Sequence, residues 1–207
     1  MMTLLAPDFT SHDAIAPDEI SVGVAWTELA DELVRVRVEA AADRFRRHES
    51  LDFPLPHDAE RAKISDLFAH EVADVHRELY TEQGELYGAE VAAKVEACLA
   101  VSDAAAARGQ QVRDAYRERC LESISRFDLL ATPTLSCVAP AVGIGDAALR
   151  PILIRFTFPF NALGWPALAL PCGPAEDGLP ASIQLVGPPG SDGLVLAAGR
   201  LLAASLD

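Results

Sequence analysis

Three short apolar runs in the C-terminal third of the chain, residues 128–135, 167–171 and 182–186, have the pattern of strands that are buried on both faces. Each run is bounded by Pro or Gly. Proline at a strand margin removes a backbone donor, so it ends the strand or begins a turn. The pattern therefore predicts three strands that are covered on both sides.

Near the N-terminus the pattern predicts a strand, then a helix, then a second strand. Residues 20–25 form a short apolar run that predicts a strand, and apolar positions at helical spacing then continue to about residue 49. Thr27 stands at the start of this predicted helix and is a suitable N-cap. Residues 51–55, followed by Pro56, predict a second strand. Strand, helix and strand within about 35 residues are typical of two parallel strands.

From residue 58 onward the pattern is helical for a long stretch. Gly84 and Gly88 predict a break, residues 90–108 a second helix that stops at Gly109, and residues 112–124 a third helix. Two further helices are predicted at residues 150–163 and 192–204. The first helix carries a continuous apolar stripe, made of Ile64, Leu67, Phe68, Val72, Val75 and Leu79.

This order of elements predicts an α/β fold, in which helices are layered on a mixed, mainly parallel sheet. Residues 1–19 show no periodicity and are expected to be an extended lead-in. Residues 20–207 are expected to form a single domain.

Composition excludes several classes of function. The net charge is −14, from 31 acidic and 17 basic residues, and such a surface repels nucleic acids and anionic membranes. No signal peptide and no membrane-spanning run of about 18 apolar residues is evident. The four cysteines lie far apart and are expected to be free thiols. We therefore expect a cytoplasmic protein with no nucleic-acid or membrane partner.

Four sequence blocks in order identify a resemblance. They are D-L-L-A-T-P-T (128–134), P-F-N-A-L-G-W-P-A (159–167), L-P-C-G (170–173) and G-L-P-A-S-I-Q-L-V-G (178–187). Together they resemble the C-terminal half of the amidase-signature hydrolases, a family that includes bacterial amidases and the A subunit of glutamyl-tRNA amidotransferase. Ser182 stands where that family more often has Gly, and residues 20–125 fit the family only as a pattern of elements. The resemblance implies a large mixed sheet between helices, of which this chain supplies one side.

The resemblance also implies a reaction, the hydrolysis of carboxamide C–N bonds through an acyl-enzyme. In the family, a Ser nucleophile, a bridging Ser in a cis peptide and a Lys act together, and both serines belong to a Gly/Ser-rich loop. This chain contains no Gly-Gly and no Ser-Ser pair. Its only lysines, Lys63 and Lys94, are predicted on helices away from the apolar stripe. We therefore assign no catalytic residue and expect a C-terminal portion that is inactive alone.

Four polar residues are the candidate substrate-binding residues by this resemblance: Thr132, Thr134, Asn161 and Gln184. A structural role is the other interpretation, and the residues by themselves favour it over substrate contact. The two threonines would then satisfy turn backbone, Asn161 would cap the helix end near Gly164, and Gln184 would pair within the sheet.

Two other groups of residues were weighed as sites. The segment from His70 to Asp74 begins like H-E-x-x-H but ends in Asp, and His76 lies about 240° around the helix from His70, so no metal site is expected. Ser136 and Cys137 follow a predicted strand, where active-site groups often gather, but no histidine follows His76 in the sequence. A hydrolase based on Cys137 is therefore a weak alternative.

No cofactor is expected. The expected partners are an amide substrate, if a catalytic half is supplied, and either an N-terminal amidase half or further copies of this chain in a homo-oligomer. The alternative function is a non-catalytic binding or assembly module, which complements a separate catalytic half or dimerises.

Overall fold

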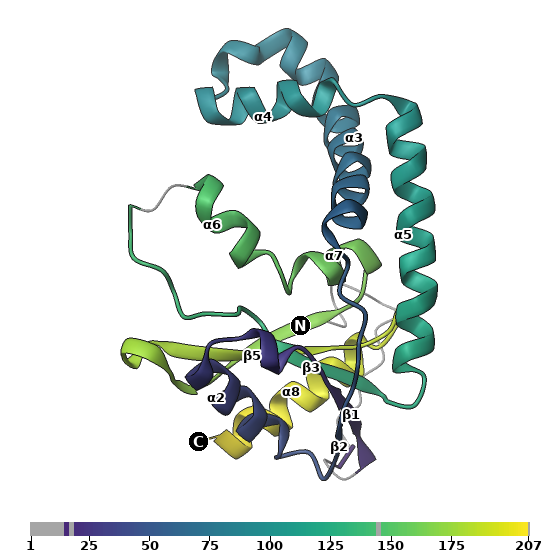
Figure 1. The fold of residues 1–207 in the computed structure, drawn as a ribbon. Coiled ribbons are helices and arrows are strands. Elements are labelled where there is room, and N and C mark those ends of the chain that lie inside the picture. Colours follow the sequence, from purple (N-terminus) through teal and green to yellow (C-terminus); the bar gives the residue numbers. More distant parts are fainter. Residues whose placement is uncertain (1–14, 17–18, 144–145, 207) are drawn as a thin grey trace. The chain divides into compact units, whose positions relative to one another are not determined.

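The computed structural model describes residues 15–16, 19–143 and 146–206 (Figure 1). The predicted lead-in at residues 1–19 therefore lies almost wholly outside the described residues. The chain divides into two compact units, the second of which is Leu55–Arg119. The first unit contains the segments before and after it, up to Pro54 and from Cys120. The single domain expected for residues 20–207 stays a prediction.

The first unit is built on a five-stranded sheet with the order β2-β1-β3-β5-β4. Strand β1 runs parallel to β2 and to β3, whereas β5 is antiparallel to both β3 and β4. The mixed sheet predicted from the sequence is confirmed, but its parallel and antiparallel pairings are equal in number. The strands are β1 (Ser21–Val24), β2 (Arg47–Ser50), β3 (Leu129–Pro133), β4 (Ala167–Pro174) and β5 (Pro180–Val186).

Burial distinguishes the central strands from the outer one. All five residues of β3 are buried, as its unbroken apolar run predicts. In β4, by contrast, half-buried positions alternate with exposed ones from Ala167 through Pro171. Strand β4 pairs with β5 alone among the described strands, and the prediction that it is buried on both faces was wrong.

The helices of this unit cover the sheet in two layers. Helices α2 (Glu32–Ala42) and α8 (Asp192–Leu206) pack on one face, and α7 (Phe158–Leu163) lies on the other (Figure 1). The apolar core lies between the sheet and the α2–α8 layer, and its largest members include Ile20, Phe45, Leu129, Ile183, Leu185 and Leu202. This packing is the layered α/β arrangement that the element order predicts.

Several predicted boundaries near the N-terminus were wrong. The predicted helix from Thr27 to residue 49 is instead a short 3-10 turn, η2 (Thr27–Leu29), followed by α2. Strand β2 occupies Arg47–Ser50, earlier than the predicted residues 51–55. Polar residues are tolerated there because β2 is paired on one side only within the described sheet, and three of its four residues are exposed.

The predicted helix at residues 150–163 is two helices. Helix α6 (Asp146–Leu153) ends before the Ile154–Thr157 connection, and α7 follows. Helix α7 ends at Gly164, which has φ 67°. Glycine adopts this left-handed conformation without a steric cost from Cβ.

The second unit is helical. It contains α3 (Asp58–Gln83), η3 (Gly84–Leu86), α4 (Ala89–Leu99) and α5 (Asp103–Ile124) as far as Arg119. The side chain of His57 caps α3 by accepting from the Glu60 amide, and the predicted break near Gly84 is confirmed.

The predicted helix stop at Gly109 was wrong, because Gly109 lies inside α5. It is buried where α5 crosses α3, and a Cβ at this position would collide with the carbonyl oxygen of Lys63. The real break between α4 and α5 falls at residues 100–102. The glycine therefore permits close helix contact and does not end the helix.

No helix within the part of the chain that the structure describes is long and apolar enough to cross a membrane.

Candidate functional site

Thr132 and Gln184 face each other across the β3–β5 pairing near the carboxyl end of β3. The Gln184 Nε2 donates to Thr132 Oγ1 at 3.2 Å and to the carbonyl oxygen of Phe156 at 3.3 Å. Thr132 Oγ1 in turn donates to the carbonyl oxygen of Pro133 at 3.0 Å. Both side chains are buried, with 0% and 4% of their surface exposed. This network joins two strands to the segment between α6 and α7.

Thr134 is the residue that directly follows β3, and it continues the contact with β5. Its hydroxyl lies 2.9 Å from the Ser182 hydroxyl, and its amide donates to the Ser182 carbonyl oxygen at 2.9 Å. Both residues are half-buried. Ser182, the departure from the family pattern, thus supplies a polar partner that Gly could not.

Asn161 lies on α7 with an exposed side chain. Its carbonyl oxygen accepts a hydrogen bond from the Gly164 amide at 3.3 Å, so its backbone takes part in ending the helix. Within the described residues its side chain hydrogen-bonds none of the other three candidates. The structure therefore brings Thr132 and Gln184 together, places Thr134 two residues after Thr132 where it bonds Ser182, and keeps Asn161 apart.

An aromatic cluster that the sequence analysis missed is centred on Trp26. The indole is stacked on Phe156 and Phe160, with ring centroids 5.6 Å and 5.5 Å away. Its Nε1 donates to the carbonyl oxygen of Phe53 at 2.9 Å. Trp26 has φ 64°, which is unusual for a residue with a Cβ. Its position directly after a predicted strand was the available signal, but the pattern was interpreted as the start of a helix.

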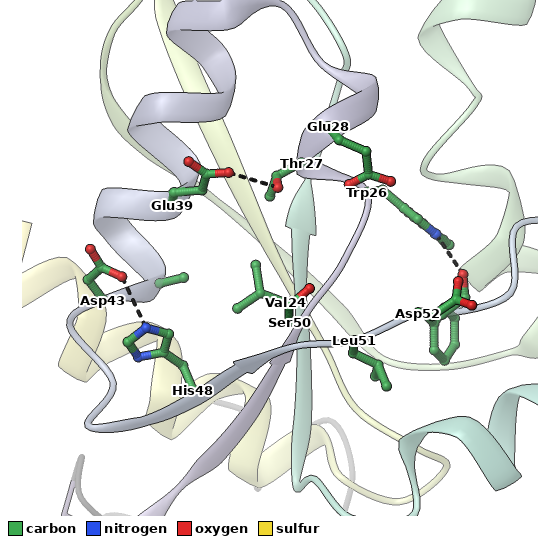
Figure 2. Close-up of a pocket in the computed structure, with 12 residues that line it drawn as sticks. Val24, Trp26, Thr27, Glu28, Glu39, Asp43, His48, Ser50, Leu51 and Asp52 are labelled. Carbon is green, nitrogen blue, oxygen red and sulfur yellow. Dashed lines mark hydrogen bonds and ion pairs between the residues drawn. The ribbon is translucent and has the colours of Figure 1, made fainter.

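A cavity of about 530 Å³ opens beyond the carboxyl ends of the parallel strands β1 and β2, and its lining residues are drawn in Figure 2. In open α/β sheets this end of the strands is a common place for ligands. The cavity is acidic, because four carboxylates line it: Glu28, Glu39, Asp43 and Asp52.

Two of these carboxylates already have partners. The Thr27 hydroxyl donates to Glu39 Oε1 at 3.0 Å, and His48 Nε2 lies 3.1 Å from Asp43 Oδ1 (Figure 2). Thr27 therefore binds a carboxylate of α2 and is not the N-cap that the sequence predicted. No group of three side chains suited to a metal ion occurs among the described residues.

The other candidate residues have local partners. His70 Nε2 lies 3.0 Å from Asp103 Oδ1 and its Nδ1 lies 3.5 Å from Asp74, whereas His76 Nδ1 lies 2.8 Å from the Tyr87 hydroxyl. His70 thus joins α3 to α5, and His76 joins α3 to the residue that follows η3.

Cys137 is in an environment that disfavours a thiolate. Burial raises the pKa of its thiol, and the nearby carboxylates of Asp31 and Glu176 raise it further. A nucleophilic cysteine requires a lowered pKa or a neighbouring base. The environment of Cys137 therefore does not favour a nucleophilic thiolate, because burial and two nearby carboxylates raise the pKa of its thiol.

Comparison with known proteins decides the family. A sequence profile of the Amidase family matches residues 6–196. The chain belongs to the amidase family. The resemblance drawn from residues 128–187 is thereby confirmed.

Relatives of this amidase-family chain include two glutamyl-tRNA(Gln) amidotransferase A subunits. The one from Myxococcus xanthus is 30% identical over 89% of this chain and 46% of the relative. The one from Chloroflexus aggregans is 39% identical over 47% of this chain and 20% of the relative.

Solved structures agree on the fold. A crystal structure of an amidase has 25% identity and a TM-score of 0.77 over 99% of this chain and 49% of that protein. The structure of 6-aminohexanoate cyclic dimer hydrolase has 20% identity and a TM-score of 0.77 over 93% of this chain and 46% of that protein. Three of these proteins match most of the amidase-family chain. The chain spans about half of the length of each of them.

The two lysines of the amidase-family chain are both exposed, Lys63 on α3 and Lys94 on α4. Neither has the buried setting expected of a catalytic lysine.

Proposed function

We propose that this chain forms the C-terminal part of an amide hydrolase, and that it cleaves carboxamide C–N bonds only together with residues outside positions 1–207. The proposal rests on one combined observation. The Amidase profile matches residues 6–196, yet these 207 residues contain neither a Gly-Gly nor a Ser-Ser pair from which a Gly/Ser-rich nucleophile loop could be built. Acyl transfer of this kind needs an activated hydroxyl and pre-placed oxyanion donors.

In this proposal the four polar residues have two kinds of role. Thr134 and Asn161 have accessible side chains and contact the substrate. Thr132 and Gln184 are buried and bonded to each other, so they act as positioning residues that hold the wall of the acyl pocket. A buried hydrogen-bonded pair suits this second role because it fixes two strands relative to each other.

Activity assays test the proposal. The chain is assayed on aliphatic and aryl amides alone, and after co-expression with the N-terminal half of an amidase of similar structure. We expect no turnover alone, and turnover with the added half that disappears when the Ser nucleophile of that half is changed to Ala. In the active pair, Asn161→Ala should raise KM more than it lowers kcat.

Turnover by the chain alone that Ser136→Ala or Cys137→Ala removes would contradict the proposal. Both variants are purified in parallel with the unmodified chain from the same host, so turnover that persists in both variants reveals a contaminating amidase.

A second function, that of a binding or assembly module, is favoured by apolar side chains exposed in the second unit. Val75 and Leu86 expose 76% and 74% of their surface, and Val72 and Leu79 continue the same apolar stripe on α3. Exposed apolar groups of this kind often mark an interaction surface. Light scattering after gel filtration distinguishes the cases: a homo-oligomer gains mass with concentration, whereas a module for a separate half remains monomeric until that half is added.

A cytoplasmic location fits either function, since the four cysteines are free thiols in the structure. Cell fractionation with an antibody to the chain tests this location.

A further inference from the structure

A second cavity, of about 320 Å³, lies on the opposite face of the sheet from α7. It is enclosed by α2, β4 and the end of α8, and is lined by Arg37, Ala40, Ala41, Arg44, Pro171, Cys172, Gly173 and Leu206. No carboxylate of a described residue lines it, although the protein has 31 acidic and 17 basic residues. Its charge is therefore opposite in sign to that of the whole chain.

Arg37 is held in a defined position in this cavity. Its Nε donates to the carbonyl oxygen of Pro174 at 2.7 Å. Because Arg presents its donors in a fixed planar fork, a guanidinium anchored through Nε keeps its terminal nitrogens for a further acceptor.

Gly173 makes this position of Arg37 possible. A Cβ on Gly173 would lie 3.3 Å from Arg37 Cδ and 3.5 Å from Nε, so the arginine stem packs directly on the β4 backbone. The glycine has φ 116°, next to an irregularity in the β4–β5 pairing between Pro171 and Gly173. The local backbone is thus shaped around the arginine.

Arg44 adds a second positive charge to the same cavity, from the turn that follows the end of α2 at Ala42. Neither guanidinium forms an ion pair with a carboxylate of another described residue. Burial raises the pKa of the Cys172 thiol to about 11, so this group adds no negative charge at neutral pH.

We propose that this cavity binds a small organic oxyanion, a carboxylate or a phosphate, between Arg37 and Arg44. Arginine is suited to such groups because its fork matches two acceptor oxygens at once. The apolar walls at Ala40, Pro171 and Leu206 can hold a short hydrocarbon chain. The site is independent of the proposed amide hydrolysis, since it lies across the sheet from α7, the helix that contains Asn161 (Figure 1).

An NMR titration of the full chain tests this site. The probes are butyrate, its neutral counterpart butyramide, and inorganic phosphate, and the signals followed are the Arg Nε–Hε resonances and the Gly173 amide. We expect saturable shifts with butyrate or phosphate and none with butyramide. Saturation by butyrate alone identifies a carboxylate site with an apolar wall, and saturation by phosphate alone identifies a phosphate site.

Three variants separate the site from general charge effects. The double variant Arg37→Gln/Arg44→Gln should weaken binding about tenfold or more, because hydrogen bonds to charged groups are the strong ones and both charges are removed. Arg37→Lys keeps the charge but loses the fork, and should give an intermediate affinity. Arg47→Gln, exposed on β2 and outside the cavity, should change affinity less than about twofold.

Shifts that rise without saturation, or that persist in the double variant, would overturn the proposal. Equal weakening by Arg47→Gln would do the same, because it would reduce the effect to net charge. Circular dichroism of each variant without ligand establishes that it is folded.

Discussion

Gln184 stands directly opposite Thr132 in the antiparallel β3–β5 pairing, and its amide nitrogen donates to the Thr132 hydroxyl at 3.2 Å. The same nitrogen also reaches the carbonyl oxygen of Phe156, between α6 and α7. One buried amide therefore joins two strands to the segment that leads into α7. Because both side chains are buried, losing these bonds would leave buried polar atoms without partners.

Gln184→Leu should destabilise the first unit by about 1–3 kcal/mol, because it leaves the Phe156 carbonyl oxygen buried without its donor. Urea unfolding measures the change. Gln111→Leu, at an exposed position on α5, is the control and should stay within about 0.5 kcal/mol. In a double-mutant cycle with Thr132→Val, additive losses would refute a direct coupling between the two side chains.

Trp26→Phe should cost about 1 kcal/mol, because it removes the Nε1 donor to Phe53 but keeps an aromatic ring against Phe156 and Phe160. Trp26→Ala should cost about 3–5 kcal/mol through the additional loss of packing. Thermal unfolding followed by circular dichroism gives the order of the two variants. Equal losses would mean that the hydrogen bond, and not the stacking, carries the effect.

Glu176→Ala should destabilise α2 by about 1 kcal/mol, since Glu176 Oε1 accepts from the Leu33 amide in the first turn of that helix at 2.8 Å. Asp31, at the N-cap position, makes no side-chain capping bond, so Glu176 supplies a cap from a distant part of the chain. Glu176→Gln retains an acceptor and should lose less. Hydrogen exchange of the Leu33 amide measures the effect locally, and an unchanged rate in Glu176→Ala would contradict it.

Gly109→Ala should destabilise the second unit by about 1–3 kcal/mol, even though Ala favours helices by about 1 kcal/mol over Gly. The reason is the close approach of α3, whose Lys63 carbonyl oxygen occupies the space of the added Cβ. Gly88→Ala is the matched control, because no atom lies within 4 Å of the Cβ that it adds. A Gly109→Ala variant that was more stable than the parent chain in urea would contradict this close contact between α5 and α3.

The Cys172 thiol predicts a pH dependence of stability. Burial raises its pKa from 9.0 to about 11, so the folded state keeps a proton that the unfolded state releases. Its contribution to stability is therefore complete below about pH 9 and falls as pH rises through about 11. The loss of stability between pH 8 and 11 should be smaller in Cys172→Ala than in the parent chain. Alkylation at pH 8, followed by mass spectrometry, should also be slower at Cys172 than in a model thiol peptide.

The sequence was most informative for strands that are buried on both faces, because almost only apolar residues are tolerated there. Strand β3 and strand β5 could be predicted because a central strand needs apolar residues along most of its length. Strand β2 could not, since its sequence R-H-E-S carries the polar residues that an outer strand tolerates. Gly109 was also misinterpreted. The sequence alone does not distinguish a glycine that ends a helix from one that allows another helix to pack closely.

Site residues could be predicted only within the sequence blocks that resemble the family. Thr132 and Gln184 were identified from their blocks, but their pairing depends on the β3–β5 register, which places residues 52 positions apart opposite each other. Trp26 lies before α2, Arg37 lies within it and Arg44 lies just after it, and the resemblance has no motif in this region. Their importance comes from neighbours supplied by distant segments, Phe156 in one case and Pro174 in the other.

The order of residues by itself determined the amidase family, the α/β class and the absence of a Gly/Ser-rich nucleophile loop from these 207 positions, because each is a property of consecutive side chains. Only the tertiary structure decided which polar groups meet: Gln184 with Thr132, Glu176 with the start of α2, and Arg37 with the β4 backbone. The physical reason is that a hydrogen bond acts over about 3 Å in space, whereas these partners are separated by 52 to 143 positions in the chain.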